Sequence, residues 1–358
     1  MKQYDEDFLN CLEGLETETT LPLKKEIDDT FRAVLKRTGL KRKISRTKRA
    51  GRILLIAAAV AACGAVTAAA SGINLGSLFR GYFERSDPNG ANGTKPAVNL
   101  TESQVETLNK SGAVLNQSVT DKGTTVTVKA AVGDKSGAYI LLDVTAPEGT
   151  VLDRDDYDFE EMPIDFHVDN TKKKGGEGFS ISWDIFNQKD ENPSDNQKAF
   201  VLRISSAGLD LQGREIGLSL VNLSTQGKKK LTFDHVVEGQ WNLNFKLDYS
   251  SDTKDLAVDK EAHYTGYTST IKNISLSPLS AAVTSVYEEN SQSDKSVDVP
   301  PLPDLIVAYR DGTTQTIQQN GPGSGGKNGF TSLYCFDAPI ELSNVASIAL
   351  GDLTIPIS

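Results

Sequence analysis

The densest group of side chains with potential chemistry is the acidic run of residues 153–161, Asp-Arg-Asp-Asp-Tyr-Asp-Phe-Glu-Glu. Carboxylate oxygens gathered this closely are the ligands that Ca²⁺ prefers. An EF-hand loop needs a glycine at its sixth position for its sharp turn, and here that position is Asp158. We therefore expect a solvated acidic loop between strands, and calcium binding is the alternative that the sequence leaves open.

No other pattern in the sequence indicates catalysis. His167, His235 and His263 are isolated from one another and from any cysteine, so a zinc site is not expected. The chain contains neither a G-x-S-x-G nucleophile motif nor a P-loop. Trp183 and Trp241 lie in alternating apolar patterns, which favours core positions over a sugar-stacking platform. We expect no catalytic residue, no cofactor-binding residue and no metal ligand, and therefore no enzyme.

The junction at residue 52 says more about function than any of these groups. Residues 41–52 carry seven basic side chains and no acidic one, and residues 53–73 are uncharged and mostly apolar. A helix of this length spans ~31 Å, about the thickness of the hydrocarbon core of a bilayer. Basic flanks stay in the cytoplasm. We therefore expect one transmembrane helix over 53–73, with the N-terminus in the cytoplasm and the chain after residue 74 outside. The basic residues of 41–52 would also contact anionic lipid headgroups.

Three other interpretations of the apolar segment remain open. A signal peptide would be cleaved near Ala68-Ala69-Ala70, although such peptides rarely begin with so long a polar region. A lipoprotein signal would place the lipid on Cys63, but the apolar run continues past that cysteine. A buried helix of a soluble protein would give no reason for the basic run before it.

Charge is divided unevenly along the 358-residue chain, whose formal net charge is −10. Residues 1–52 contain 13 Lys and Arg and 9 Asp and Glu, a net of +4, which leaves 25 basic and 39 acidic residues, a net of −14, for the remainder. An acidic exterior argues against nucleic acid as a ligand. Cys11 is expected inside, Cys63 within the membrane segment and Cys335 outside, and one external cysteine cannot form an internal disulfide.

The first 50 residues predict two short amphipathic helices, at 4–16 and 21–38, because apolar residues recur there at helical spacing. Helices of this length are marginal alone in water. They would therefore pair with each other or fold on a cytoplasmic partner, and a membrane-proximal spacer without a ligand is the alternative. The candidate partner-binding residues are Phe8, Leu12, Leu15, Leu23, Ile27, Phe31, Val34 and Leu35.

Residues 74–98 begin apolar and end in Pro, Gly and Asn, which indicates a stalk. The sequence Thr-Glu-Ser-Gln at 101–104 is a capping-box pattern and predicts a short helix over 101–110. Residues 1–52, 53–73 and 74–98 are thus expected to form a cytoplasmic helical segment, a transmembrane helix and a stalk.

Beyond residue 112, apolar and polar residues alternate in short runs that turn-forming residues separate, which is typical of antiparallel sandwiches. We divide this mainly β exterior into two antiparallel β-sandwich-like domains, 99–226 and 227–358. The expected strands are 125–129, 139–144, 164–168, 179–183, 199–204, 216–223, 241–247, 264–277, 281–287 and 342–357, with a hairpin of 304–310 and 313–317.

Two of these runs resemble the ectodomain of the domain of unknown function 4179 family, namely NQSVTDKGTTVTV at 116–128 and YILLDVTAPEG at 139–149. The segments GQWNLNF at 239–245 and ISLSPL at 274–279 look like the C-terminal β domain often found with it. The resemblance covers roughly residues 50–358. It implies a single-pass membrane protein of a Gram-positive bacterium that acts as an anti-sigma factor for an extracytoplasmic-function sigma factor. It implies no catalytic residues.

The first 50 residues lack the His-x₃-Cys-x₂-Cys motif of zinc-binding anti-sigma domains, so contact with a sigma factor would be free of zinc. Taken together, the sequence predicts a regulator in the cell membrane that holds a sigma factor through its N-terminal helices. Its β ectodomain would sense the envelope. The alternative is a surface-anchored binding or adhesion protein without a cytoplasmic partner.

Overall fold

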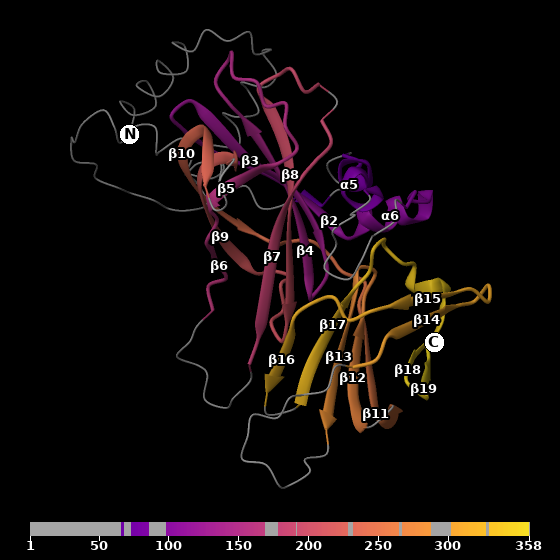
Figure 1. Ribbon diagram of the computed structural model, residues 1–358. Coiled ribbons are helices and arrows are strands. Elements are labelled where there is room, and N and C mark those ends of the chain that lie inside the picture. Colours follow the sequence, from indigo (N-terminus) through magenta and orange to yellow (C-terminus); the bar gives the residue numbers. More distant parts are fainter. Residues whose placement is uncertain are drawn as a thin grey trace, which may run out of the picture. The chain divides into compact units, whose positions relative to one another are not determined.

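The computed structural model describes residues 66–67, 73–85, 98–168, 178–190, 192–227, 232–264, 267–287, 302–326 and 329–357. The chain divides into two compact units, Met1–Ala62 and Cys63–Ser358, and every described residue belongs to the second. The prediction of a mainly β unit is confirmed, because the described residues form four antiparallel sheets and two α-helices (Figure 1). The two helices predicted within residues 1–52 lie outside the described residues.

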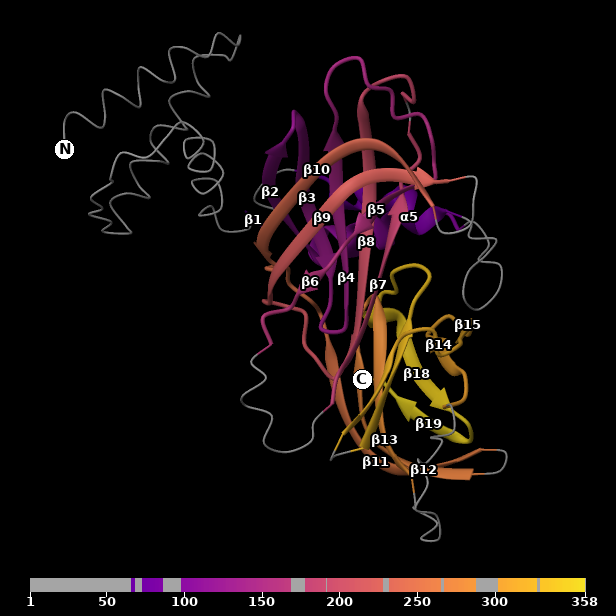
Figure 2. The same ribbon diagram turned by 60° about the vertical axis from the view of Figure 1, so that its left-hand side comes forward.

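The first sandwich consists of a six-stranded sheet in the order β1-β2-β3-β4-β8-β7 and a second sheet in the order β10-β9-β5, with β6 also paired to β9. Its strands are β1 (Val66–Thr67), β2 (Gly112–Asp121), β3 (Thr124–Gly133), β4 (Gly137–Thr145), β5 (Tyr157–Glu161), β6 (Ile164–Asp165), β7 (Ser180–Asn187), β8 (Gln197–Ala207), β9 (Glu215–Gln226) and β10 (Phe233–Lys246). Both sheets contribute side chains to one buried core, among them Phe200 and Trp241, so they pack face to face (Figure 2).

The second sandwich consists of a five-stranded sheet in the order β11-β12-β13-β17-β16 and a four-stranded sheet in the order β15-β14-β18-β19. Its elements are β11 (Lys254–Tyr264), β12 (Tyr267–Leu276), β13 (Ser280–Tyr287), β14 (Leu305–Tyr309), β15 (Thr314–Ile317), β16 (Gly323–Gly326), β17 (Gly329–Cys335), the 3₁₀ turn η3 (Leu342–Asn344), β18 (Val345–Leu350) and β19 (Leu353–Pro356). The predicted hairpin is confirmed as β14 and β15, and its Gly312 has a φ of +88°. Tyr334 and Ile348 belong to the buried core that both sheets share.

The division between the sandwiches differs from the predicted boundary at 226–227. Strand β10 pairs with β9 along its length, so it completes the first sandwich, and the second begins at β11. Trp241 lies in the first core as predicted for a core residue, fully buried, and its Nε1 donates to the Thr124 carbonyl oxygen at 2.9 Å. The core position expected for Trp183 is wrong, because this side chain lies on edge strand β7 and is 39% exposed.

Helices α5 (Leu75–Glu84) and α6 (Glu102–Lys110) precede the first long strand. Helix α6 confirms the predicted helix and its capping box, in which the Gln104 amide N donates to Thr101 Oγ1 at 3.3 Å. Helix α5 replaces the first part of the predicted stalk. Its Leu75, Phe79 and Phe83 recur every fourth residue and are buried in one cluster with α6 and the outer face of the six-stranded sheet.

Strand β1 lies within the segment predicted to span a membrane. Val66 and Thr67 pair with Val114 and Ala113 of β2, so these two residues are extended where a helix was expected. The pairing gives hydrogen-bond partners to backbone groups at an otherwise open sheet edge. In the described part of the chain, no helix is long and apolar enough to cross a membrane. Residues 53–65 and 68–72 of the predicted span lie outside that part.

Candidate functional site at the junction of the two sandwiches

A buried carboxylate joins the two sandwiches. Asp134 lies in the turn between β3 and β4 and is fully buried. Its Oδ1 accepts hydrogen bonds from the amide N of Ser136 at 2.8 Å and of Gly137 at 2.7 Å, within the same turn. Its Oδ2 accepts from Ser277 Oγ, in the turn between β12 and β13, and from Ser280 Oγ, at the start of β13, at 2.8 Å. One side chain thus ties a turn of the first sandwich to a turn of the second.

The electrostatics of this carboxylate depend on neutral donors. Burial raises the pKa of Asp134 above its usual value, and the bonds from the two serine hydroxyls and two backbone amides act in the opposite direction. The Tyr249 hydroxyl donates to the Asp134 carbonyl oxygen at 2.9 Å, and burial raises the pKa of Tyr249 so that it stays protonated. A buried charge is costly unless it is hydrogen-bonded. The first sandwich supplies the two amide donors to the carboxylate and the second supplies the two hydroxyl donors, so the network is complete only in the docked arrangement.

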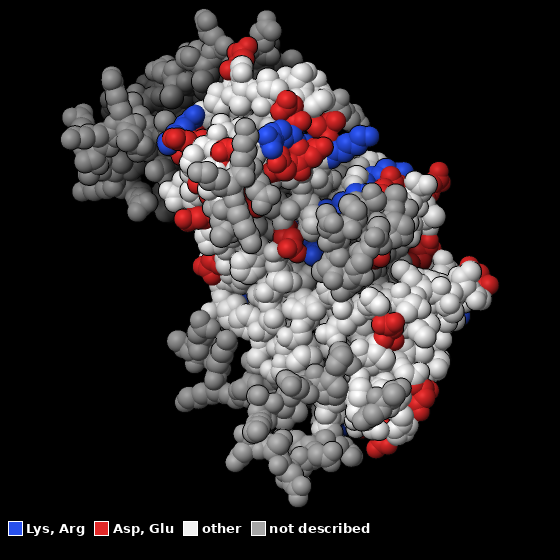
Figure 3. All heavy atoms as spheres, in the orientation of Figure 1, with Lys and Arg blue, Asp and Glu red and all other residues white. Residues whose placement is uncertain are grey.

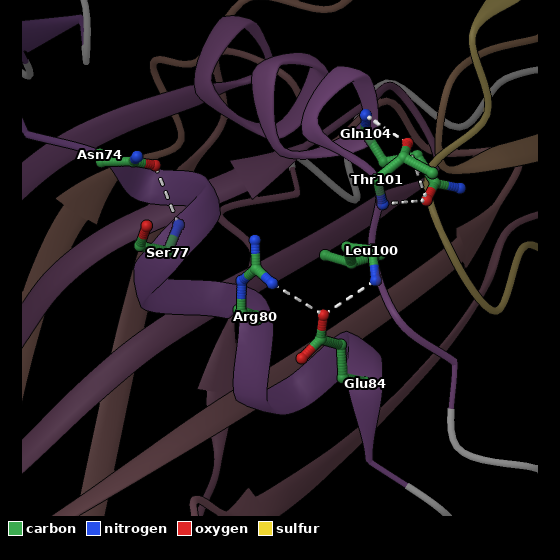
Figure 4. A network of polar contacts seen from close by, with 7 residues as sticks. All are labelled: Asn74, Ser77, Arg80, Glu84, Leu100, Thr101 and Gln104. Carbon is green, nitrogen blue, oxygen red and sulfur yellow. Dashed lines mark hydrogen bonds and ion pairs between the residues drawn. The ribbon is translucent and has the colours of Figure 1, made fainter.

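Figure 4 shows the hydrogen bonds that connect helix α5 with the residues leading into helix α6. Glu84, at the end of α5, accepts hydrogen bonds at Oε1 from Arg80 Nη1 at 3.1 Å and from the Leu100 amide N at 2.8 Å. The start of α5 is capped by Asn74, whose Oδ1 accepts from the Ser77 amide N at 3.0 Å. Glu84 therefore ties the end of α5 to the residue that leads into α6.

The same helices contact the second sandwich. Gln104 Nε2 of α6 donates to the Pro339 carbonyl oxygen at 2.8 Å. Leu279 and Ala338 of the second sandwich share a buried cluster with α5, α6 and the six-stranded sheet. The helix pair therefore packs on both sandwiches. A change in how the two sandwiches dock would alter the contacts of α5.

Cys335 marks a third contact at the junction. Its Sγ lies 3.8 Å from Ser205 Oγ of β8, and the side chain is only 8% exposed. Burial raises the pKa of the Cys335 thiol to about 11, so it is protonated at neutral pH. The protonated, buried thiol is a packing group and a poor nucleophile.

A cleft of about 450 Å³ opens beside the Asp134 turn. Its floor is formed by residues of β11, β12, β13 and β17 of the second sandwich. The wall opposite the floor is formed by Lys135, Ser136 and residues 208–210 of the first sandwich. Lys135 Nζ lies 2.6 Å from Asp255 Oδ2, so this ion pair crosses from one sandwich to the other. The pKa of Lys135 is raised and that of Asp255 is lowered, in both cases mainly through this hydrogen bond.

The carboxylates of the acidic run 153–161 do not converge on one point. Arg154 binds Asp156 through two hydrogen bonds of 2.7 and 2.6 Å, while Asp155 pairs with Lys198 at 2.8 Å. Glu160 is turned to Ser224 and other partners on β9 and β10. Among the residues that the structure describes, no three His, Cys, Asp or Glu side chains are placed to hold a metal ion.

The residues predicted to bind a cytoplasmic partner lie outside the described residues, namely Phe8, Leu12, Leu15, Leu23, Ile27, Phe31, Val34 and Leu35. Asp134, Ser277 and Ser280 were not found from the sequence, because an aspartate before Lys-Ser-Gly and serines around Pro-Leu have the composition of ordinary turns. On the face drawn in Figure 3, acidic side chains are spread over the surface and basic ones lie mostly beside them.

No family model matches this chain, and no curated protein matches it either. Among solved structures, the conserved domain protein from Bacillus anthracis is similar over 66% of this chain and 75% of its own chain, with 16% identical residues and a TM-score of 0.45. This likeness assigns no activity or ligand to the present chain.

Proposed function

We propose that this chain is a single-pass membrane signalling regulator that holds a sigma factor in the cytoplasm and senses the envelope with its two β-sandwiches. The order of segments carries the proposal. Two amphipathic helical patterns, the basic run 41–52 and the apolar segment 53–73 precede a unit made of β-sandwiches. The resemblance to the domain of unknown function 4179 family supports the choice of a sigma factor as the partner.

The junction supports a sensing role for the described unit. Helix α5 begins two residues after the proposed membrane segment, at Leu75, and packs with α6 against both sandwiches. A ligand that alters the docking of the sandwiches would therefore act on the segment that leads to the membrane. Release of the partner would follow from a change in that segment, by rearrangement or by proteolysis.

Strand β1 and a continuous membrane helix over 53–73 exclude each other, because Val66 and Thr67 cannot be extended and helical at once. The proposal requires β1 to leave β2 when the segment enters the bilayer. A full-length Val66→Cys/Val114→Cys variant, oxidised in isolated membranes, tests this requirement. We expect no disulfide between the two positions, and quantitative formation would overturn the membrane crossing. Thr120→Cys/Thr125→Cys, an exposed facing pair of β2 and β3, is the positive control.

The partner is tested by purifying the tagged full-length chain from membranes of its native host and identifying bound proteins by mass spectrometry. We expect one sigma factor, which Phe31→Asp should release because it places a charge in the apolar stripe. Ala33→Asp adds the same charge on the opposite side of the predicted helix and should retain the partner. If no sigma factor is recovered, or if both variants retain it equally, the anti-sigma proposal fails. A surface-anchored binding protein then becomes the better account.

A further inference from the structure

We propose that the cleft between the two sandwiches binds a neutral glycan, with the sugar chain lying across the outer face of the five-stranded sheet. The inference deepens the proposed function by naming the class of external ligand. It rests on that function only for its biological role, because binding itself depends on the described residues alone.

The floor of the cleft carries a row of polar side chains that crosses the strands. Asn273 of β12 is paired with Thr284 of β13, and Thr284 with Thr331 of β17, and all three residues line the cleft. Paired residues on neighbouring strands lie on the same face, and strands are ~4.8 Å apart, so the row is ~10 Å long. A row of polar side chains on three neighbouring strands fits a short chain of linked units better than one small molecule.

The chemistry of the row matches hydroxyl groups. Hydroxyl and amide side chains both donate and accept hydrogen bonds, as sugar hydroxyls do. Thr284 Oγ1 and Thr331 Oγ1 lie 3.0 Å apart, and each hydroxyl keeps the capacity for a further bond. A peptide fits less well, because the backbone groups of β12, β13 and β17 are already paired with their neighbours and a peptide cannot add to this face as a strand.

The charges of the cleft exclude a strongly anionic polymer. Lys135 is paired with Asp255, and Asp210 also lines the cleft, so acidic groups outnumber basic ones. Phosphate-rich or polyacidic chains would meet net repulsion there. Neutral sugars avoid this cost and can use the carboxylates as hydrogen-bond acceptors.

The wall opposite the floor belongs to the first sandwich and lies next to the Asp134 turn. Lys135 and Ser136 follow Asp134 directly, and Gly208 has a φ of +83° with no room for a Cβ, which would meet the Gly178 carbonyl oxygen at 2.7 Å. This tight wall places backbone and short side chains over the floor. A bound glycan would therefore contact both sandwiches and stabilise their docked arrangement.

Calorimetric titration of the full-length chain tests the inference, in a detergent whose headgroup is not a sugar. The probes are the tetrasaccharides of N-acetylglucosamine and of glucose, and poly(glycerol phosphate) is the anionic comparison. We expect saturable binding of at least one tetrasaccharide. The isosteric double variant Thr284→Val/Thr331→Val should weaken it at least about tenfold, since it removes two hydroxyls from the row.

The matched control is Thr316→Val/Thr354→Val, which makes the same change at two exposed threonines of the four-stranded sheet. It should leave the affinity unchanged. The inference is overturned if neither tetrasaccharide binds, if both double variants bind equally, or if only the anionic polymer binds. These outcomes are separate from recovery of a sigma factor, so a failure here would leave the proposed cytoplasmic partner to its own test.

Discussion

Removing the two hydroxyls that reach Asp134 from the second sandwich should uncouple the sandwiches. In a Ser277→Ala/Ser280→Ala variant, Oδ2 of the buried carboxylate loses both of its hydrogen-bond donors. The two amide donors on Oδ1 remain, because they belong to the same turn as Asp134. The first sandwich therefore keeps its local structure, while the hydrogen bonds of the carboxylate to the second sandwich are lost.

The size of the effect follows from the number and type of the lost bonds. A hydrogen bond to a charged group contributes ~1.5–3 kcal/mol net, so two would contribute ~3–6 kcal/mol. Ser277 Oγ also lies 3.0 Å from the Ser280 carbonyl oxygen, so part of its contribution is independent of the carboxylate. Protonation of Asp134, whose pKa is already raised, limits the cost further. We therefore expect a loss near the lower bound, about 3 kcal/mol in the free energy of unfolding.

Urea unfolding followed by two probes measures this loss. The chain has two tryptophans, Trp183 and Trp241, and both lie in the first sandwich, so their fluorescence reports on that sandwich alone. Far-ultraviolet circular dichroism reports on both. In the natural chain the two transitions should coincide, and in the variant they should separate.

A matched control makes the same two changes at exposed serines of the first sandwich, Ser118→Ala/Ser219→Ala. It should leave the transitions coincident. If the Ser277→Ala/Ser280→Ala variant also unfolds in one coincident transition within about 0.5 kcal/mol of the natural chain, Asp134 does not hold the sandwiches together.

Three further predictions concern Asp134, Gly76 and Cys335. Because burial raises the pKa of Asp134, the folded state holds the Asp134 proton more tightly than the unfolded state does. The unfolding free energy of the natural chain minus that of Asp134→Asn should therefore be largest in acid and decline as the pH rises through the raised pKa. A difference that does not change with pH would contradict the raised pKa. Gly76→Ala should destabilise the chain by about 1–3 kcal/mol in urea unfolding, because its Cβ would lie 2.5 Å from the Val105 carbonyl oxygen. Gly81→Ala, in the same helix with only a 3.4 Å neighbour, should be neutral or stabilising. Cys335 should resist alkylation at about pH 8 until urea is added, as judged by peptide mapping, because with a pKa of about 11 only about a thousandth of it is thiolate; rapid labelling of the folded chain would contradict its burial.

Local signals in the sequence determined the β class, helix α6 and the β14–β15 hairpin. Each depends on neighbouring residues only: alternation along a strand, the Thr101 and Gln104 capping box, and the Asp-Gly turn at 311–312. Helix α5 also has a local signal, since its apolar residues recur every fourth position, but the glycine-rich and proline-containing sequence after it favours a stalk.

The tertiary structure decided what these local signals could not. Alternation in β10 shows that one face is buried, but pairing with β9 decides that the face belongs to the first core. Asp134 resembles any turn aspartate until its turn meets Ser277 and Ser280, far along the chain. The same holds for the cleft row, since Asn273, Thr284 and Thr331 become neighbours only through strand register. Periodicity and capping act between residues a few positions apart, whereas docking and register depend on contacts between distant residues that form only when the whole unit folds.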